Sequence, residues 1–595
     1  MRYLANQFVE VDGERVRFFA AAWAIFGHGN VAGLGDALHS HRDVLPTLRA
    51  HNEQAMGHAA IAYAKAQRRR RAMICTSSIG PGATNMVTPC ALAHVNRLPV
   101  LFLPGDVFAG RGPDPVLQQV EDFADGTVSA NDCFRPISRV FDRIERPEQL
   151  ITALPRVMAM LTDPVVCGPA TVAICQDVQA EAFDFPAAFL APGLWRTRRQ
   201  GADPREISDL ARLLENSAAP LIIAGGGVIY GHAETALAQF AMRTGVPVAE
   251  TQAGKGALTW DHTCNLGGVG VTGTSAANGA AEAADLVIGI GTRLTDFTTG
   301  SRSLFANTRC RLAQINVGAF DAHKHGALAV VGDAGVVLAA LATELRDWQA
   351  PIGWRETCSA KLAAWDQDWR EATASDEAIP VATDAQVLGA VWRAAPADAV
   401  VVCAAGGLPG ELHKLWRTRT AGGYHVEYGY SCMGYEIAGG LGVKLADPSR
   451  EVIVMVGDGS YLMLNSEIAT SVSLGQKLII VVLDNGGFGC IDRLQRKLGS
   501  VSFNNLLPAE ARVDFAAHAT SLGALAEPVA DIDGLEAAMV RAIAADRTSV
   551  IVIATDPNAS TQIGGAWWDV PVSEVSERPQ ITAAREAYNA ARHRP

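Results

Sequence analysis

Short, continuous runs of apolar residues recur along the whole chain and alternate with longer stretches of helical patterning. A strand that is apolar at every position must be covered on both faces, and such strands occur mainly in parallel sheets flanked by helices. The sequence therefore predicts an α/β architecture built on parallel sheets. The predicted strands cover residues 99–103, 170–174, 221–224, 285–290, 451–456, 478–483 and 550–554.

Two segments of different composition interrupt this alternation. The first, 185–201, is rich in Pro, Ala and Gly, and the second, 348–380, is rich in Trp and charged residues. They divide the chain into blocks 1–190, 200–345 and 380–570, each of the size of a single domain. We expect these blocks to share an α/β plan. The last residues, 583–595, are expected to form a helical or frayed tail.

Composition narrows the class of protein. The formal net charge is −12, whereas a general nucleic-acid binder normally carries a basic surface. The eleven cysteines form no CxxC pair and are interpreted as reduced thiols, which favours the cytoplasm. The N-terminus has no apolar signal core, and the apolar runs are too short to span a bilayer. We therefore expect a soluble cytoplasmic protein that binds neither nucleic acid nor membrane.

Polar residues and glycines follow two neighbouring predicted strands. The strand 451–456 runs into Gly457-Asp458-Gly459-Ser460, and a helix is predicted from about residue 464 to 474. The strand 478–483 then ends in Asp484-Asn485-Gly486-Gly487-Phe488-Gly489. The carboxyl ends of parallel strands are where open α/β sheets bind ligands. These two strand ends are therefore the candidate ligand site.

The residue types at these strand ends suit magnesium bound to a diphosphate. Mg²⁺ prefers oxygen ligands in octahedral geometry and usually shares them with phosphates. Asp458 offers a carboxylate oxygen, Asn485 an amide oxygen, and the backbone near Gly487 a carbonyl. Glycines let the main chain approach an ion, and N–H groups at a helix start suit a diphosphate. A lone Gly-Asp-Gly is often only a tight turn, so the prediction depends on both strand ends together.

The coupled pattern resembles the thiamine-diphosphate signature of the superfamily that includes acetolactate synthase and pyruvate oxidase. The resemblance implies thiamine diphosphate and Mg²⁺ as cofactors and three doubly wound parallel-sheet domains: an N-terminal pyrimidine-binding domain, a central α/β domain, and a C-terminal domain for diphosphate and magnesium. It implies that Asp458, Asn485 and Gly487 hold the metal ion. Asp484 departs from the superfamily, which more often has Asn there. The resemblance also assigns Gly457, Gly459 and Ser460 to cofactor binding.

Further cofactor contacts follow from the same resemblance. The segment 428–440 is similar to the superfamily's Gly-x-Met-Gly element, which places Met433 under the thiazolium ring and the backbone carbonyl of Ser431 at the 4′-amino group. From the residues alone, Met433 could equally be a core methionine in a Gly-rich turn. Upstream, Gly406, Gly407 and Leu408 follow another strand and are expected to line the diphosphate.

Glu53 has two interpretations. It opens an Ala-rich helix, where an acid is favoured by the helix dipole. Alternatively, it hydrogen-bonds the aminopyrimidine ring, which then helps to deprotonate the thiazolium C2. This role requires a carboxyl group in a largely apolar pocket, which tends to raise its pKa. The Asn-Glu-Gln string at 52–54 matches the superfamily at this location, and the resemblance implies the catalytic role.

Rarer strings resemble one branch of the superfamily, whose members hydrolyse a trihydroxycyclohexane-1,2-dione in myo-inositol catabolism. The resemblance implies hydrolytic ring opening to 5-deoxy-D-glucuronate, with the thiazolium as electron sink. It also implies a homodimer or a dimer of dimers, because different subunits supply Glu53 and Asp458 in the family. The strings are 26–35, 77–85, 93–99, 113–119, 131–136, 176–180 and 432–440.

A polyhydroxylated ring needs a pocket with many hydrogen-bond donors and acceptors. We select His28 and Gln119 as catalytic candidates that contact the substrate, although each such residue alone is more often a satisfied structural one. The other polar side chains available in loops of the first block are Asn30, Asn85, His94 and Gln118.

Three alternatives stay open. An acetolactate synthase-like, oxalyl-CoA-type or other thiamine-diphosphate lyase or decarboxylase would use the same cofactor residues. A nucleotide-binding oxidoreductase is suggested by the Gly-rich strand ends at 221–227 and 288–292, although neither matches GxGxxG. An inactive scaffold would be expected to have lost Glu53, Asp458 or Asn485, and all three are present.

Overall fold

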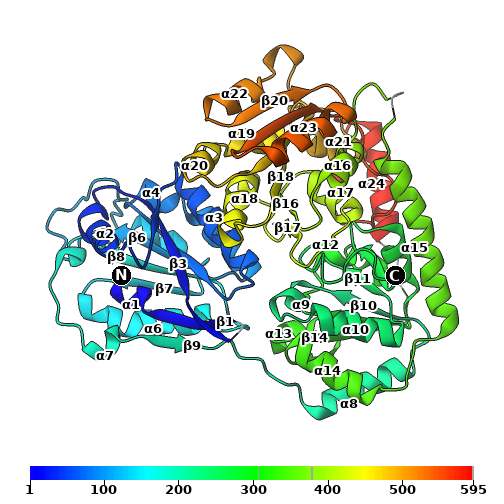
Figure 1. The fold of residues 1–595 in the computed structure, drawn as a ribbon, viewed down its shortest axis with the longest axis horizontal. Helices are drawn as coiled ribbons and strands as arrows, with labels where there is room; N and C mark the ends of the chain where they lie inside the picture. The colour runs from blue at the N-terminus through cyan, green and yellow to red at the C-terminus, as the bar shows by residue number, and fades with distance from the viewer. Residues whose placement is uncertain (12, 306, 377–378, 593–595) are drawn as a thin grey trace.

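A computed structural model describes residues 1–11, 13–305, 307–376 and 379–592 (Figure 1). Within these residues the chain forms three six-stranded sheets in which every neighbouring pair of strands is parallel. Helices lie against these sheets, so the predicted α/β class with doubly wound parallel sheets is confirmed. In Figure 1 the N-terminal unit is blue to cyan, the central unit green, and the C-terminal unit yellow to orange.

The strands of each sheet are given in spatial order. The N-terminal sheet contains β4 (Thr47–Leu48), β3 (Phe19–Ile25), β5 (Ala72–Ser77), β6 (Val100–Asp106), β8 (Pro169–Cys175) and β7 (Val140–Ile144). The central sheet contains β12 (Asn265–Gly268), β11 (Val248–Glu250), β10 (Pro220–Ala224), β13 (Leu286–Ile290), β14 (Arg311–Asn316) and β15 (Leu328–Val331). The C-terminal sheet contains β17 (Tyr424–Val426), β16 (Val400–Cys403), β18 (Val452–Gly457), β19 (Ile479–Asp484), β21 (Ser549–Ala554) and β20 (Leu525–Val529).

The helices are given in chain order. The N-terminal unit has α1 (Arg2–Ala5), η1 (Val31–Gly35), α2 (Asp36–Ser40), α3 (Glu53–Ala66), α4 (Pro81–Thr84), α5 (Val87–Asn96), η2 (Ala130–Phe134), η3 (Pro147–Gln149), α6 (Leu150–Leu161), η4 (Val178–Ala180) and α7 (Ala187–Leu190). The central unit has α8 (Pro204–Glu215), α9 (Gly226–Tyr230), α10 (Glu234–Thr244), α11 (Ser275–Ala283), α12 (Asp296–Thr299), η5 (Ser303–Phe305), α13 (Ala319–Ala322), η6 (Lys324–Gly326) and α14 (Ala334–Glu344). The remainder are α15 (Ile352–Thr373), α16 (Asp384–Ala394), α17 (Leu408–Leu415), α18 (Tyr435–Ala446), α19 (Asp458–Met463), α20 (Glu467–Ser473), α21 (Gly489–Lys497), η7 (Ala509–Ala511), α22 (Phe515–Ser521), α23 (Ile532–Ala544) and α24 (Pro579–Arg592).

The predicted helix at 464–474 differs from the structure. The chain becomes helical directly at Asp458, forms α19, and then breaks at Leu464, whose backbone angles (φ −157°, ψ 83°) are not helical. The next helix, α20, occupies only Glu467–Ser473. The predicted helix is therefore shortened to α20, and α19, which begins immediately after the strand, was not predicted.

The two segments of unusual composition are partly ordered secondary structure. Segment 185–201 contains β9 (Gly193–Trp195), which pairs in parallel with β1 (Gln7–Val11); β1 also pairs antiparallel with β2 (Glu14–Arg17). Segment 348–380 is mostly the helix α15, whose tryptophans are buried, and its residues 377–378 lie outside the described part of the chain. The domain boundaries 1–190, 200–345 and 380–570 stay predictions. The tail is helical in α24, and 593–595 lie outside the described residues.

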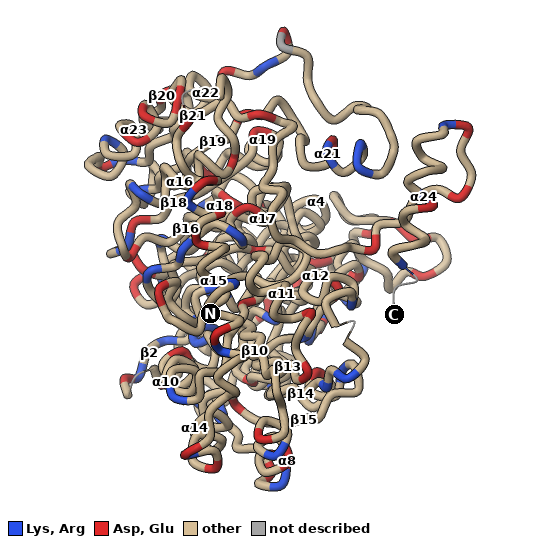
Figure 2. Tube along the Cα trace, turned by 90° about the vertical axis from the view of Figure 1, so that its right-hand side faces the viewer, with Lys and Arg blue, Asp and Glu red and all other residues tan. Residues whose placement is uncertain are grey.

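Charged residues of both signs are interspersed along the chain in Figure 2. Some of them join the units: Arg68 forms a 2.9 Å ion pair with Glu234 of the central unit, and the Arg69 guanidinium lies 3.9 Å from the centroid of the Tyr230 ring. None of the helices in the described part of the chain combines the length and hydropathy that a membrane crossing requires.

Helix α3 packs closely against α18 and joins the N-terminal and C-terminal units (Figure 1). A Cβ atom on Gly442 of α18 would lie 2.1 Å from the Ala59 carbonyl oxygen and 2.8 Å from the Ala62 Cβ atom of α3. The missing side chain therefore lets the two helix backbones approach. This contact fixes the start of α3 relative to the C-terminal sheet.

We predict that Gly442→Ala destabilises the protein by about 2–3 kcal/mol, because the nearest atom is backbone and cannot move aside. Gly353→Ala in α15 is the matched control, since nothing lies within 4 Å of the added atom. The control should be neutral or slightly stabilising. Thermal midpoints of both purified variants test this, and equal midpoints would contradict the close-packing argument.

Candidate functional site

The ends of β18 and β19 bring Asp458 and Asn485 together. The two strands are paired in parallel, with Gly457 opposite Leu483, so the next residues of each strand lie at the same edge of the sheet. Asp458 is buried, and its Oδ1 atom and the Oδ1 atom of Asn485 are both buried without a hydrogen-bond partner among the described residues. Two unpaired buried oxygens on adjacent strand ends are available to coordinate an ion.

Burial raises the pKa of Asp458 to about 6, and the nearby Asp484 carboxylate adds to the rise. Backbone N–H groups of Gly459, Asn485 and Gly487 oppose it, although Oδ1 accepts no well-aligned hydrogen bond. A cation at this position would favour the ionised carboxylate. The donor set of one carboxylate and one amide oxygen fits a hard divalent ion.

A third oxygen is close to the same turn. The Gly487 carbonyl oxygen lies 3.4 Å from the position that a Cβ atom on Gly459 would take. Gly487 has a φ of +140°, and a Cβ atom there would lie 2.4 Å from the Asn505 carbonyl oxygen. The described residues contain no cluster of three His, Cys, Asp or Glu side chains suited to a metal.

Asp484, the departure from the superfamily pattern, has partners of its own. Its Oδ1 atom accepts hydrogen bonds from the Gly486 N–H at 3.0 Å and from Arg512 Nη1 at 2.8 Å. Arg512 thus compensates the additional negative charge beside Asp458. The side chain of Asp484 caps the glycine turn and is not left over for a metal ion.

Two glycine positions face open space. No atom lies within 4 Å of the place where a Cβ atom would sit on Gly406 or Gly457, and Gly406 has a φ of +83°. Gly407 follows, and Leu408 begins α17. These loops after β16 and β18 leave room for a phosphate-sized group to approach the main chain.

The segment between β17 and α18 lies beside the same turn. Ser431 has a φ of +50°, and Met433 is half-buried. Gly434 donates its N–H to Ser460 Oγ at 2.8 Å, and a Cβ atom on it would lie 2.9 Å from the Leu464 Cβ atom. The segment that carries Ser431 and Met433 is therefore joined to the residues after the Gly-Asp-Gly turn.

Glu53 begins α3, where Asn52 caps the helix by accepting a hydrogen bond from the Gln54 N–H. Asn85 Nδ2 donates to Glu53 Oε2 at 2.9 Å and lies 3.1 Å from Asn52 Oδ1. Gly82 keeps this position open, since its Cβ would lie 3.2 Å from Glu53 Oε1. The carboxylate is thus oriented by its own unit.

The loop 78–82 brings the other N-terminal candidates near Glu53. A Cβ atom on Gly27 would lie 2.4 Å from Ser78 Oγ, which places the loop of the exposed His28 against it. A Cβ atom on Gly80 would lie 1.6 Å from the Gln118 carbonyl oxygen. His28, Glu53 and the Gln118–Gln119 turn therefore gather at the carboxyl edge of the N-terminal sheet.

The polar loop residues differ in how they are satisfied. Gln119 Oε1 accepts a hydrogen bond from the Ala130 N–H at 3.1 Å, while its Nε2 atom is buried without a partner among the described residues. Asn30 bonds Gly27 and Thr76, and His94 Nδ1 bonds the Ile137 carbonyl. Gln119 thus keeps a donor for a ligand, whereas Asn30 and His94 are engaged inside the fold.

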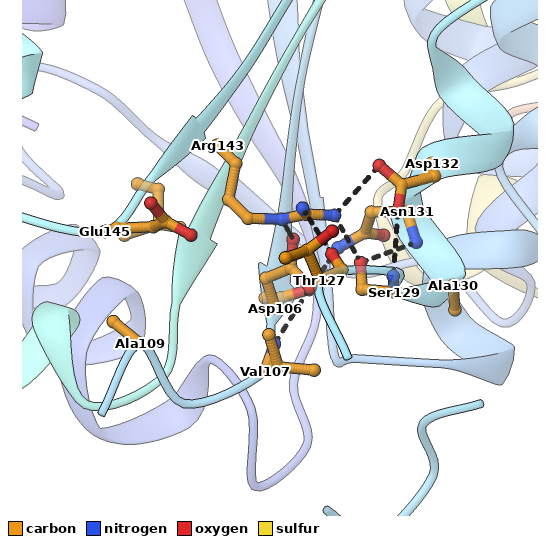
Figure 3. Close-up of polar contacts among 12 residues, drawn as sticks. Asp106, Val107, Ala109, Thr127, Ser129, Ala130, Asn131, Asp132, Arg143 and Glu145 are labelled. Carbon is orange, nitrogen blue, oxygen red and sulfur yellow. Dashed lines mark hydrogen bonds and ion pairs between the residues drawn. The ribbon is translucent and has the colours of Figure 1, made fainter. Parts of the chain in front are cut away.

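Arg143 fixes the loop that carries Gln119 (Figure 3). Its guanidinium donates to Asp106 Oδ2 at 2.8 Å, to the Thr127 carbonyl at 3.0 Å and to Ser129 Oγ at 2.7 Å. It also pairs with Asp132 Oδ1 at 3.0 Å. One planar group therefore joins the end of β6, the loop 107–129 and η2.

A central cavity bears on the nucleotide-binding alternative. It has a volume of about 470 Å³ and lies where the central unit meets the other two, beside the ends of β10 and β13. Its lining includes Arg97, Gly227, Tyr230, Gly291, Arg293 and Trp568. The Gly-rich strand ends at 221–227 and 288–292 thus border this cavity.

Several residues that hold this site were missed by the sequence reasoning. They make tertiary contacts that have no local pattern, and the only signal is an acid or arginine inside an apolar or Gly-rich run. They are Arg143, Glu427, Glu436 and Arg512.

Comparison with known proteins finds three family models in this chain. The N-terminal TPP binding domain of thiamine pyrophosphate enzymes matches residues 23–124, their central domain matches 207–341, and their C-terminal TPP binding domain matches 379–553. The order of the three matches follows the order of the three sheets.

Curated relatives match almost the whole chain. A protein of Geobacillus thermodenitrificans (strain NG80-2), named 3D-(3,5/4)-trihydroxycyclohexane-1,2-dione hydrolase, is 44% identical, with 98% of this chain and 96% of the relative covered. Proteins with the same name from Bacillus cereus (strain AH820) and from Clostridium tetani are each 42% identical, with 99% of this chain and 96% of the relative covered.

We predict that Arg143→Ala destabilises the protein by about 3–5 kcal/mol, because the fully buried Asp106 loses its charge partner. Adding Asp106→Ala should recover part of this loss, since the unpaired charge is then removed. Denaturant titrations of both single variants and the double variant measure the coupling. Arg205→Ala, at an exposed ion pair with Asp203, is the control and should leave the midpoint unchanged. Strictly additive effects at 106 and 143 would contradict the network.

Proposed function

We infer that this chain, which belongs to the thiamine pyrophosphate enzyme family, hydrolyses 3D-(3,5/4)-trihydroxycyclohexane-1,2-dione in myo-inositol degradation. The observation that carries this inference is 42–44% identity, over nearly the whole chain, to relatives named for that hydrolysis. The bond between the two carbonyl carbons breaks. Water supplies a hydroxyl to the carbon that becomes the carboxylic acid and a hydrogen to the carbon that becomes the aldehyde, which gives 5-deoxy-D-glucuronate.

Thiamine diphosphate, when bound, supplies the electron sink that makes this carbon–carbon bond breakable. We assign Mg²⁺ to the side-chain oxygens of Asp458 and Asn485 and the carbonyl of Gly487. The two unpartnered oxygens support this assignment. We assign the remaining cofactor contacts to residues of the adjoining loops, namely Gly406, Gly407, Leu408, Ser431, Met433, Gly457, Gly459 and Ser460.

We assign to Glu53 the hydrogen bond to the aminopyrimidine ring through which a proton is exchanged. Its carboxylate keeps one fixed orientation because Asn85 donates to one oxygen, and Gly82 leaves the other oxygen approachable. His28 and Gln119 are assigned to the substrate. The exposure of His28 and the unpartnered Nε2 atom of Gln119 support this, since a polyol ring offers hydroxyl acceptors and donors to both.

We propose a homodimer or dimer of dimers in which one subunit supplies Glu53 and the other Asp458. Apolar side chains are exposed beside both halves of the site, which favours their burial against another copy. On the N-terminal unit these are Leu117, Val120 and Phe123; on the C-terminal unit they are Leu462, Met463, Phe488 and Ile491.

All eleven cysteines are described and form no disulfide, which supports a cytoplasmic location.

The proposed activity can be tested directly. Purified protein should convert the trihydroxy-dione to an acid only when thiamine diphosphate and Mg²⁺ are both present. Asp458→Ala should lower cofactor affinity by about 100-fold or more, because it removes a metal ligand.

Product analysis with pyruvate tests the lyase alternative, and an absorbance spectrum tests for a bound flavin. Acetolactate formation without dione hydrolysis would overturn the assignment.

A separate prediction concerns the subunit origin of the site. Glu53→Gln should retain cofactor and Mg²⁺ binding and lose most turnover, and Asp458→Ala should be inactive. When the two variants are co-expressed, half of the dimers are mixed, and each mixed dimer has one site with both native residues. Activity should therefore return to about a quarter of the native value. No recovery in demonstrably mixed dimers would place both residues in the same subunit's site.

A further inference from the structure

Two buried glutamates flank the segment that carries Ser431 and Met433. Glu427 follows β17 and is 2% exposed, and Glu436 lies in the first turn of α18 and is 1% exposed. Between them the backbone takes left-handed angles at Ser431 (φ +50°) and Gly434 (φ +88°). A serine in this region is strained and persists only where its surroundings fix it.

Glu427 holds the backbone on both sides of Ser431. Its Oε1 atom accepts hydrogen bonds from the Tyr430 N–H at 2.9 Å and from Asn96 Nδ2 at 2.8 Å. Its Oε2 atom accepts from the Cys432 N–H at 3.2 Å. The carboxylate therefore fixes the residues before and after Ser431, and Asn96 ties them to the N-terminal unit.

Glu436 holds the residue after Met433 and joins it to two cofactor loops. Its Oε2 atom accepts from the Gly434 N–H at 3.1 Å and from Ser460 Oγ at 2.7 Å. Its Oε1 atom accepts from the Ala405 N–H at 3.2 Å. One carboxyl group thus connects the segment to the turn after β18 and to the loop before Gly406.

Both glutamates use both oxygens as acceptors of N–H groups. Burial disfavours the charged form, and it raises the pKa of Glu436 to about 7 against the opposing hydrogen bonds from Ser460, Ala405 and Gly434. An uncharged apolar residue would avoid this unfavourable burial but would leave the amides unpaired. Burying the two acids is unfavourable in itself, but it fixes the backbone path of the segment between them.

We propose that Glu427 and Glu436 are positioning residues that together hold segment 428–434 so that the Ser431 carbonyl and the Met433 side chain face the cofactor ring. This inference rests on the proposed function of the site. Neither glutamate contacts substrate or cofactor; each acts through the main chain of the segment.

Glutamine variants test the proposal, because an amide replaces one acceptor oxygen with an NH₂ group that faces a backbone N–H. Glu250→Gln is the matched control: Glu250 is also 2% exposed, and its Oε1 atom accepts from the Gly256 and Leu258 N–H groups in the central unit. The control makes the same change in a carboxylate that holds a loop of the central unit instead of segment 428–434.

The main measurement is hydrogen–deuterium exchange at C2 of bound thiamine diphosphate, with no substrate present. Glu427→Gln and Glu436→Gln should slow this exchange by about tenfold or more in cofactor-saturated protein, and Glu250→Gln should change it less than about twofold. Calorimetric titration of the apoprotein should also separate the pair. Glu436→Gln should weaken cofactor affinity more than Glu427→Gln, because only Glu436 also holds Ala405 and Ser460.

Aspartate variants at 427 and 436 extend the test to proteins that keep the charge. They withdraw the carboxylate by one methylene and should slow the exchange as well. Native exchange in folded, cofactor-loaded Gln or Asp variants would overturn the proposal, and so would equal slowing in Glu250→Gln. If the unaltered protein accelerates C2 exchange but leaves the dione unchanged, the proposed substrate fails while the positioning role is still decided by the variants.

Discussion

Two buried oxygen atoms without hydrogen-bond partners, one on Asp458 and one on Asn485, impose the main constraint on this structure. Asp458 and Asn485 directly follow strands β18 and β19. Because the residues of these strands are buried and largely apolar, the strands cannot shift to give the two oxygens a partner without exposing the core. Leaving such oxygens unpaired is unfavourable for the fold alone. The C-terminal unit therefore acts as a rigid frame that keeps these two oxygens in fixed positions, as the proposed cation site requires.

A second constraint is the close packing of helix α3 against helix α18. The backbone contact of Gly442 with Ala59 locks α18 to α3, and α18 begins directly after Gly434 while α3 begins at Glu53. In the proposed dimer, where Glu53 and Asp458 of one site come from different subunits, the two helix starts serve different sites, and the packing at Gly442 joins those sites.

Local pattern was enough to predict the sheets and the two strand ends, because continuous apolar runs and glycine turns are encoded within a few residues. It failed for the helix after Asp458, since the break at Leu464 depends on the turn packing against Gly434. Arg143, Glu427 and Glu436 were not predicted, because each has a partner that is distant in sequence, namely Asp106, Asn96 and Ala405 respectively. The orientation of Gln119 depends on that same kind of long-range contact, so the sequence could name the residue but not its neighbours.

The buried glutamates restrict the conformational freedom of the glycine-containing loops. Glycine lets main chain approach a ligand closely, but it also gives the loop many conformations to lose on folding. Here the amides of Tyr430, Cys432, Gly434 and Ala405 are all bound by Glu427 or Glu436, whereas Gly406 and Gly457 face open space. Internal carboxylates therefore fix the loops through some of their amides and leave the neighbouring positions accessible. Because each acid binds more than one amide, a single buried carboxyl group holds several loop residues in place.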